Sequence, residues 1–580
     1  MKENLVSKLE IIKEEVQKSP IAYVFLLLGI IFAICYAIIT RWVSDSAFIS
    51  FRIARNFYFG SSFSFNPEES FEVSSNFLWK ALIYLGMNFH IDPIRLSMII
   101  GLVSYLSLLL LVFFISKEKS QKTESYLPVA FLLLATNPNS LAYASSGLET
   151  SLFSVLLFLG FSCFYFVKRV RHLFLGNLFL IMASITRGEG IFFYALGVIY
   201  SIRFLYIDED RKQRIIKLLV CNFPFLMFYI PYTFFRLSYH ETIVFSDAFQ
   251  FHFTKETMFQ GFEYLRLYFL SNAFLFIIPI LLLINFSKKE ILSRKLKPSS
   301  YKDLFSTEKN PAKVEDPRKL LLYIIFPYLV YILFIGGSSE FGRLLVPLNS
   351  FLFLYTELTI YKKVSNPKYN IPLIIVLVLM NFISLDPYRN STRKEINEIS
   401  KEEDIYRLND IYKIKNLCLS IRDIFKERKL RVGFGKSQNI LVYYLEPKYA
   451  LDTSKLERKH SKIEPKKLKK LILKKLKKKS ILVHLDNRNL IGNKNYNTLV
   501  WREYPINFRI LYYDSSFLEK LKETNQFQYI SFPKYLDLYY SKIESFSLKK
   551  IKTDYKRFKE FYFNHNNDKE RENRFLEILN

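Results

Sequence analysis

Long apolar runs alternate with short polar segments through the first two thirds of the chain. The first run, residues 21–40, contains no charged residue. A run of about 20 such residues is long enough to cross a hydrocarbon layer about 30 Å thick as a helix. Similar runs recur as far as Leu385, and none follows it. The pattern therefore predicts an α-helical polytopic membrane region followed by a water-exposed region.

The number of apolar runs predicts about eleven transmembrane helices. Residues 1–20 form a charged, amphipathic lead. The run after the lead is too long for the apolar part of a cleavable signal, so we interpret the lead as cytosolic and the first span as retained. The predicted spans are residues 21–40, 93–115, 126–142, 149–167, 173–186, 190–206, 215–235, 262–286, 320–337, 343–361 and 371–386.

One apolar segment, residues 76–89, is interpreted differently. It has only about 14 residues, too few for a span, and it contains Lys80. Such a segment fits a helix that lies in the membrane interface. If it crossed the membrane, most of the later basic loops would turn outward. We therefore expect residues 41–92 to form a first extracytoplasmic loop with interfacial helices.

Basic residues gather in alternate loops, which predicts the orientation of the chain. Cytoplasmic loops carry an excess of lysine and arginine. This rule places the N-terminus inside and the region after the last span outside. The basic residues of these loops are Lys117, Lys119 and Lys122; Lys168, Arg169 and Arg171; Arg211, Lys212 and Arg214; Lys288, Lys289, Arg294 and Lys295; and Lys362, Lys363 and Lys368.

Composition changes this interpretation little. Half of the residues are hydrophobic, and the formal net charge is +29. A basic balance can indicate nucleic-acid binding. Here the excess sits in the loops that set topology and in the region after the spans, so we do not infer a nucleic-acid partner. The four cysteines are too few for a disulfide framework.

The less basic loops carry specific polar groups, all predicted on the outer side. Ionisable groups retained at membrane depth usually pair with each other or face a polar cavity. A transporter would more often place them in mid-span. A cluster on one side indicates an extracytoplasmic active site. These residues are Asp45, Arg52, Arg55, Asn56, Glu72 and Asn76; Glu149; Arg187 and Glu189; His240, Glu241, Asp247 and His252; and Glu340 and Arg343.

The first of these loops resembles a known signature. "DSAFISFRIARNFYFGSSFSFNPEESFEVSSNFLW", from Asp45 to Trp79, resembles the first-loop pattern of GT-C membrane glycosyltransferases similar to mycobacterial terminal β-(1→2)-arabinofuranosyltransferase. Three later segments, "GLETSLF", "TRGEG" and "FGRLLVPL", resemble further motifs of that family in the same order. The resemblance covers residues 21 to about 386.

The resemblance implies transfer of a sugar from a polyprenyl phosphate to a glycan or glycolipid acceptor outside a bacterial cytoplasmic (inner) membrane. The acceptor hydroxyl must lose a proton, and Asp45 is the expected general base. The leaving phosphate suits arginine, so Arg187 and Arg343 are expected to bind it. No metal-ligand motif appears, and assistance by a divalent cation stays open. The expected substrate-binding residues are Arg52, Asn56, Glu72, Asn76, Glu149, Glu189 and Asp247.

The chain also departs from the family pattern. Ser46 stands where the pattern has the second acid of a pair, which leaves Asp45 as the expected base. Gly188 replaces a proline in "TRGEG", and Ser74 stands where the pattern has Gly-Tyr. The sugar, the acceptor and the stereochemical outcome do not follow from the resemblance.

The region after the spans, residues 387–580, is expected to be a small extracytoplasmic α/β domain. Segments such as "LRVGFG", "PKYALD" and "SILVHL" predict strands. Residues 466–479 have Leu468, Leu471, Ile472 and Leu476 on one helical face and lysines around the rest, typical of a helix that covers a sheet or rests on anionic headgroups or an anionic glycan.

Three other functions stay open at this stage. One is a transferase of the same superfamily that acts on protein or lipid A. Another is a transporter or flippase for a lipid-linked sugar, although no inverted repeat is visible. The last is a membrane scaffold without catalytic activity.

Overall fold

The computed structural model describes most of the helical region and parts of the C-terminal region. The described ranges are residues 19–67, 75–120, 126–166, 170–206, 211–240, 254–272, 317–338, 342–363, 367–382, 405–408, 431–434, 438–452, 481–484, 497–501, 507–511, 527–531 and 568–579, with isolated positions such as Glu340 between them. The chain divides into two compact units. One comprises residues 1–65 and 70–408, and the other residues 66–69 and 409–580.

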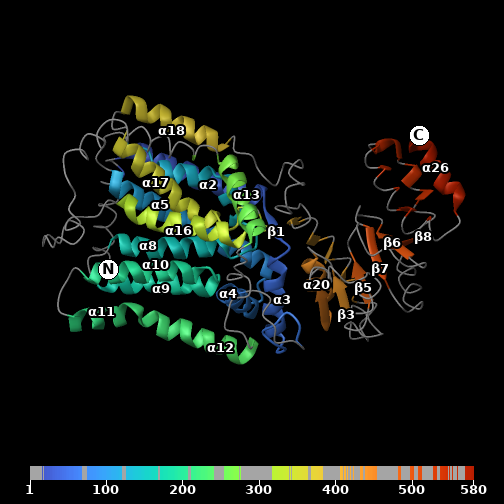
Figure 1. Ribbon diagram of the computed structural model, residues 1–580, viewed down its shortest axis with the longest axis horizontal. Coiled ribbons are helices and arrows are strands. Elements are labelled where there is room, and N and C mark those ends of the chain that lie inside the picture. The colour runs from blue at the N-terminus through green and yellow to red at the C-terminus, as the bar shows by residue number, and fades with distance from the viewer. Residues whose placement is uncertain are drawn as a thin grey trace. The chain divides into compact units, whose positions relative to one another are not determined.

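The first unit is mostly helical. Its long helices α5, α8, α9, α10, α16 and α17 lie side by side, and Figure 1 shows α3 running across one end of them. The helices are α2 (Pro20–Ile39), α3 (Ala47–Tyr58), α4 (Phe77–Asn88), α5 (Pro93–Ser120), α6 (Val129–Thr136), α7 (Pro138–Ala144), α8 (Thr150–Tyr165), α9 (Val170–Thr186), α10 (Gly190–Tyr206), α11 (Arg211–Pro224), α12 (Ile230–His240), α13 (Lys255–Ser271), α16 (Pro317–Ile335), α17 (Val346–Lys363) and α18 (Pro367–Phe382).

Several helices are suited to a membrane. Among the described residues, four helices are long and apolar enough to cross one: Pro20–Ile39, Pro93–Glu118, Gln213–Tyr239 and Arg318–Ile335. The first buries only 22% of its apolar window inside the protein and the third only 17%. Because water would penalise so much exposed apolar surface, these helices need lipid around them. The predicted total of eleven spans stays a prediction.

One predicted span, residues 126–142, is two helices. The first, α6, ends at Thr136, and α7 begins at Pro138. Proline fits the first position of a helix because that position needs no N–H donor. The Asn137 side-chain oxygen accepts a hydrogen bond from the Ser140 backbone N–H at 3.0 Å and caps α7. The chain therefore changes direction at Asn137, where hydropathy alone predicts one continuous helix.

The helix that begins at Arg211 runs further than predicted. A π-helical turn, η1 (Phe225–Tyr229), follows Pro224, and α12 continues to His240. Proline cannot donate the backbone hydrogen bond, and a π turn accommodates its ring. The predicted span ended at residue 235, so part of the predicted loop is helix. The predicted span 262–286 also differs, because α13 begins at Lys255 after the Thr254 cap.

The first loop contains a short strand and two helices. Strand β1 (Trp42–Ser44) pairs antiparallel with β2 (Ile405–Arg407), a segment from the end of the unit. The next elements, α3 and α4, each have 12 residues. At 1.5 Å per residue, each is about 18 Å long, short of the roughly 30 Å core of a membrane. Neither helix can cross a membrane alone.

The second unit contains a six-stranded sheet of order β4-β3-β5-β7-β6-β8. Strand β3 pairs parallel with β4 and β5, and the other pairs are antiparallel. The three segments predicted as strands are β3, β4 and β5, and α20 (Asn439–Leu445) connects β3 to β4. The strands are β3 (Arg431–Phe434), β4 (Tyr449–Asp452), β5 (Ile481–His484), β6 (Asn497–Trp501), β7 (Asn507–Leu511) and β8 (Phe527–Ser531).

Two further features complete the second unit. Asn66 exchanges two hydrogen bonds with the backbone of Ala450, at 2.8 and 2.9 Å, and so pairs with edge strand β4. Near the C-terminus, α26 (Lys569–Leu579) packs Phe575 into a small apolar cluster. The lysine-rich residues 466–479 lie outside the described residues.

Candidate active site

Glu149 is the centre of a buried network of charged residues. It directly precedes α8, and 1% of its surface is exposed. Its Oε1 accepts a hydrogen bond from Arg343 Nη2 at 2.6 Å and lies 3.7 Å from Arg187 Nε. Its Oε2 accepts a hydrogen bond from Asn76 Nδ2 at 3.1 Å. One carboxylate therefore joins three segments that are far apart in sequence.

Arg187 and Glu189 come from the turn between α9 and α10. They form an ion pair, and the Arg187 guanidinium lies 5.1 Å from the centre of the Phe153 ring. A Cβ at Gly190 would lie 2.5 Å from the backbone of Ser184. The last glycine of "TRGEG" is therefore needed for close packing of this turn, which presents both charged groups to the network.

Glu340 and Arg343 come from the segment between α16 and α17. Arg343 Nη1 lies 3.1 Å from Glu340 Oε2. Glu340 Oε1 accepts hydrogen bonds from the hydroxyls of Ser44, at 2.8 Å, and Ser46. The segment thus connects the Glu149 network to the first loop. In the sequence, Glu340 is visible as an acidic residue three positions before Arg343. It was not among the residues expected to bind substrate.

Asp45 lies between Ser44 and Ser46, at the corner where β1 leads into α3. It is 3% exposed. The Ser44 N–H donates to the Ser146 carbonyl at 3.0 Å and holds the corner. Gly147 has φ +76°, and a Cβ there would lie 3.1 Å from Val43 and 3.3 Å from Ala47. The glycine of "GLET" therefore lets the motif pack against the Asp45 corner.

The other predicted residues of the first loop divide into two groups. Asn76 also donates to the Ser50 hydroxyl at 2.8 Å, so it links α3 to the network. Arg52 Nε donates to the Phe65 carbonyl at 2.8 Å, and Asn56 donates to the carbonyls of Ser64 and Phe65. These contacts give Arg52 and Asn56 a part in shaping the loop. Glu72 and Asp247 lie outside the described residues.

Among the described residues, the network contains more carboxylates than guanidiniums. Its carboxylates are Glu149, Glu189 and Glu340, and its guanidiniums are Arg187 and Arg343. Buried polar atoms near it lack a hydrogen-bond partner, among them Arg343 Nε and the Thr150 hydroxyl. In folded proteins, buried polar atoms generally have a hydrogen-bond partner in the protein or in ordered water. No group of three or more metal-binding side chains occurs among the described residues.

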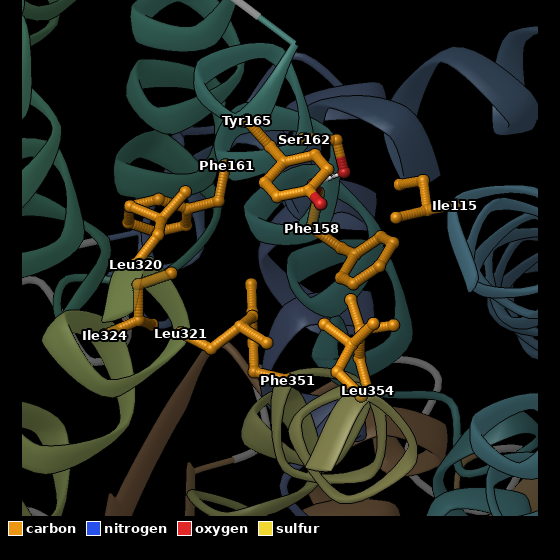
Figure 2. Close-up of a pocket in the computed structure, with 11 residues that line it drawn as sticks. Ile115, Phe158, Phe161, Ser162, Tyr165, Leu320, Leu321, Ile324, Phe351 and Leu354 are labelled. Carbon is orange, nitrogen blue, oxygen red and sulfur yellow. Dashed lines mark hydrogen bonds between the residues drawn. The ribbon is translucent and has the colours of Figure 1, made fainter. Parts of the chain in front are cut away.

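Side chains from α5, α8, α16 and α17 line a small apolar pocket (Figure 2). Its lining includes Ile115 and Leu358, near the ends of α5 and α17, whereas Arg343 lies just before α17 begins. The pocket holds about 20 Å³ of free space. That volume suits a water molecule. The lining residues lie toward the ends of these helices opposite Glu149 and Arg343. The pocket is therefore separate from the charged network.

No protein-family model matches the chain, and no curated protein matches it. Among solved structures, the chain is similar to ArnT from Cupriavidus metallidurans bound to undecaprenyl phosphate. The identity is 10%, the alignment covers 85% of this chain and 98% of that chain, and the TM-score is 0.48.

Proposed function

We propose that this chain is a membrane glycosyltransferase of GT-C type. It moves a sugar from a polyprenyl phosphate to a glycan or glycolipid acceptor on the outer side of the membrane. The observation that carries the proposal is the convergence of four segments at one end of a set of apolar helices. The first loop, "GLET", "TRGEG" and "EFGRLL" contact one another through Glu149 and Glu340.

Asp45 acts as the general base in this proposal. As the acceptor oxygen bonds to the anomeric carbon, its proton passes to the Asp45 carboxylate. The bond between the anomeric carbon and the phosphate oxygen breaks, and the phosphate leaves with the electron pair. Carboxylates nearby also stabilise the positive charge that develops on the sugar ring. The buried corner between β1 and α3 holds Asp45 in one place, as a base requires.

Arg343 is the donor-phosphate ligand in this proposal, and Arg187 supports it. The Arg343 side chain is 22% exposed and that of Arg187 is 6% exposed, so a ligand reaches Arg343 more readily. Arg343 Nε also lacks a hydrogen-bond partner. Arg187 is held between Glu149 and Glu189 and packs on Phe153. Both arginines neutralise Glu149, and Arg343 is the one with an exposed part that a phosphate can reach.

Asp45→Asn tests the proposed base. The variant keeps the size of the side chain and cannot accept the proton, so we expect transfer from polyprenyl-phosphate sugars to fall at least about 100-fold. Asp92→Asn is the matched control, because Asp92 is exposed at the start of α5 and its side chain accepts a hydrogen bond only from the Arg95 N–H among the described contacts. Purified protein would be tested with synthetic polyprenyl-phosphate pentoses and hexoses.

The result also separates the alternative functions. Undiminished transfer by Asp45→Asn would refute the base. Movement of a lipid-linked sugar across vesicles without any transfer product would favour a flippase. Transfer to protein or lipid A would keep the reaction and change the acceptor.

A further inference from the structure

We propose that Glu340 is a positioning residue that supplies the second carboxylate of the Asp45 corner. This inference rests on the proposed function and adds a residue to its site. The first-loop pattern that the chain resembles has an acid at the position of Ser46. Here the Ser46 hydroxyl donates a hydrogen bond to Glu340, so a carboxylate from a distant segment occupies the place beside position 46.

Glu340 contacts the residues on both sides of Asp45 in the sequence. Its Oε1 accepts hydrogen bonds from the hydroxyls of Ser44 and Ser46, the two residues that flank Asp45. A carboxylate that accepts hydrogen bonds from two hydroxyls holds both in one orientation. Because Ser44 ends β1 and Ser46 precedes α3, this single group fixes the corner that carries the base.

The other oxygen of Glu340 faces the proposed phosphate ligand. Oε2 lies 3.1 Å from Arg343 Nη1, outside hydrogen-bonding geometry. Glu263 on α13 also faces an arginine three residues further on, Arg266, and among the described contacts its carboxylate accepts hydrogen bonds from that arginine alone. The two hydroxyl contacts are additional. Glu340 therefore couples the position of Asp45 to that of Arg343, and so the base to the leaving group.

Moving the carboxylate back to position 46 tests the inference. The variants are Glu340→Ser, Ser46→Asp and the double variant, with Glu263→Ser as the matched control. For Glu340→Ser, we expect kcat to fall at least about tenfold with an unchanged or lower donor KM, because Arg343 loses a competing carboxylate. For Ser46→Asp alone, we expect lower kcat. The introduced carboxylate and that of Glu340 then lie close together and repel each other, which disturbs the corner that holds Asp45.

The double variant decides between positioning and simple stability. We expect its kcat to return to within about threefold of the wild type, because the carboxylate is again beside position 46. A double variant no more active than Glu340→Ser overturns the inference. Equal losses for Glu340→Ser and Glu263→Ser, with parallel falls in melting midpoint, overturn it as well.

Failure of the proposed function would be seen separately. If the wild type transfers no polyprenyl-phosphate sugar, the proposed function fails. Melting midpoints of the full chain then still test the placement of Glu340. We expect the double variant to melt higher than Glu340→Ser, and an equal or lower midpoint overturns the placement.

Discussion

Arg187 and Arg343 contact the same carboxylate oxygen, but their surroundings differ. Arg187 is enclosed by two carboxylates and a phenylalanine ring, whereas Arg343 is partly exposed. The same residue type therefore has two different parts in the site. Sequence reasoning assigned both arginines to the donor phosphate, because a motif identifies the residue and not its exposure.

The two arginines should respond differently to substitution. Arg343→Gln should raise the donor KM roughly 10- to 100-fold, since a charge-assisted hydrogen bond contributes about 1.5–3 kcal/mol. Arg187→Gln should lower the melting midpoint and kcat together, because Glu189 then loses the arginine that it pairs with and Glu149 loses one of its two. Steady-state kinetics and thermal unfolding of both variants are the measurements. A raised donor KM in Arg187→Gln alone would reverse the two assignments.

Some contacts of the site could be predicted from residues and others could not. Asp45, Glu149, Arg187 and Arg343 stand in motifs with a recognisable order. The bond between Ser46 and Glu340 joins residues 294 positions apart. The contact forms only when the segment between α16 and α17 meets the first loop in the folded chain, and local patterns contain no signal for it.

At the scale of elements, hydrophobic runs located the helices but not their interruptions. The break at Asn137 depends on hydrogen bonds from several helices. Asn137 Nδ2 donates to Asn272 at 2.7 Å and to Asn381 at 3.2 Å. Asn349 in turn donates to Asn137 Oδ1 at 3.3 Å. A hydropathy pattern identifies the apolar residues around Asn137. It does not identify the residues that form hydrogen bonds with the Asn137 side chain, so it does not predict the break.

Asn137→Ala should destabilise the helical unit. It removes the cap of α7 and leaves buried partners on three other helices unsatisfied, a loss of roughly 1–3 kcal/mol. A drop of several degrees in the melting midpoint in detergent would be the result. Asn88→Ala is the control, because the Asn88 side chain is exposed and donates to Tyr84 in its own helix. Equal midpoints in the two variants would contradict the role of Asn137.

In the second unit, α26 is held by an ion pair that depends on pH. Arg571 donates two hydrogen bonds to Asp537, at 2.8 and 3.1 Å. These bonds hold the pKa of Asp537 below its ordinary value of 3.8. A lowered pKa in the folded state stabilises the fold above the ordinary pKa, and the contribution is lost as the pH falls through the lowered value.

Asp537→Asn should therefore loosen α26 near neutral pH and matter little in acid. Amide-exchange protection factors of residues 569–579 should be lower in the variant at about pH 6, and the difference should shrink below about pH 3. Because Asp537 is exposed, the effect should be small. A difference that persists in acid would show that the ion pair is not its cause.

At the scale of the whole molecule, contacts restrict how often the chain crosses a membrane. Strand β1 pairs with β2, so residues 42–44 and 405–407 lie on the same side. The chain must then cross an even number of times between them. The predicted spans after the first provide ten crossings. Counting residues 76–89 as another would give an odd number, so the pairing supports the interfacial interpretation of that segment.

The same reasoning applies to the charged network. Asn76, Arg187 and Arg343 all contact Glu149, so their loops lie on one side. The predicted spans give even numbers of crossings between each of these loops and the next. The alternation of basic and less basic loops along the sequence predicts that these four residues lie on one side. The positive-inside rule places the basic loops on the cytoplasmic side, so the less basic loops lie together on the other side. Which side faces the cytoplasm is a separate prediction.

Cysteine labelling of intact cells tests that orientation. Ser61→Cys, in the first loop, and Lys559→Cys, in the second unit, should react with a membrane-impermeant maleimide from outside, because the positive-inside rule places both positions there. Glu118→Cys, at the end of α5, should react only after the membrane is permeabilised. All three positions are exposed in the protein, so access depends on the membrane. The wild type controls for reaction at the native cysteines. Labelling of Glu118→Cys in intact cells, with Ser61→Cys protected, would reverse the orientation. It would also move the proposed transfer to the cytoplasmic face, where the donor and acceptor would have to be found.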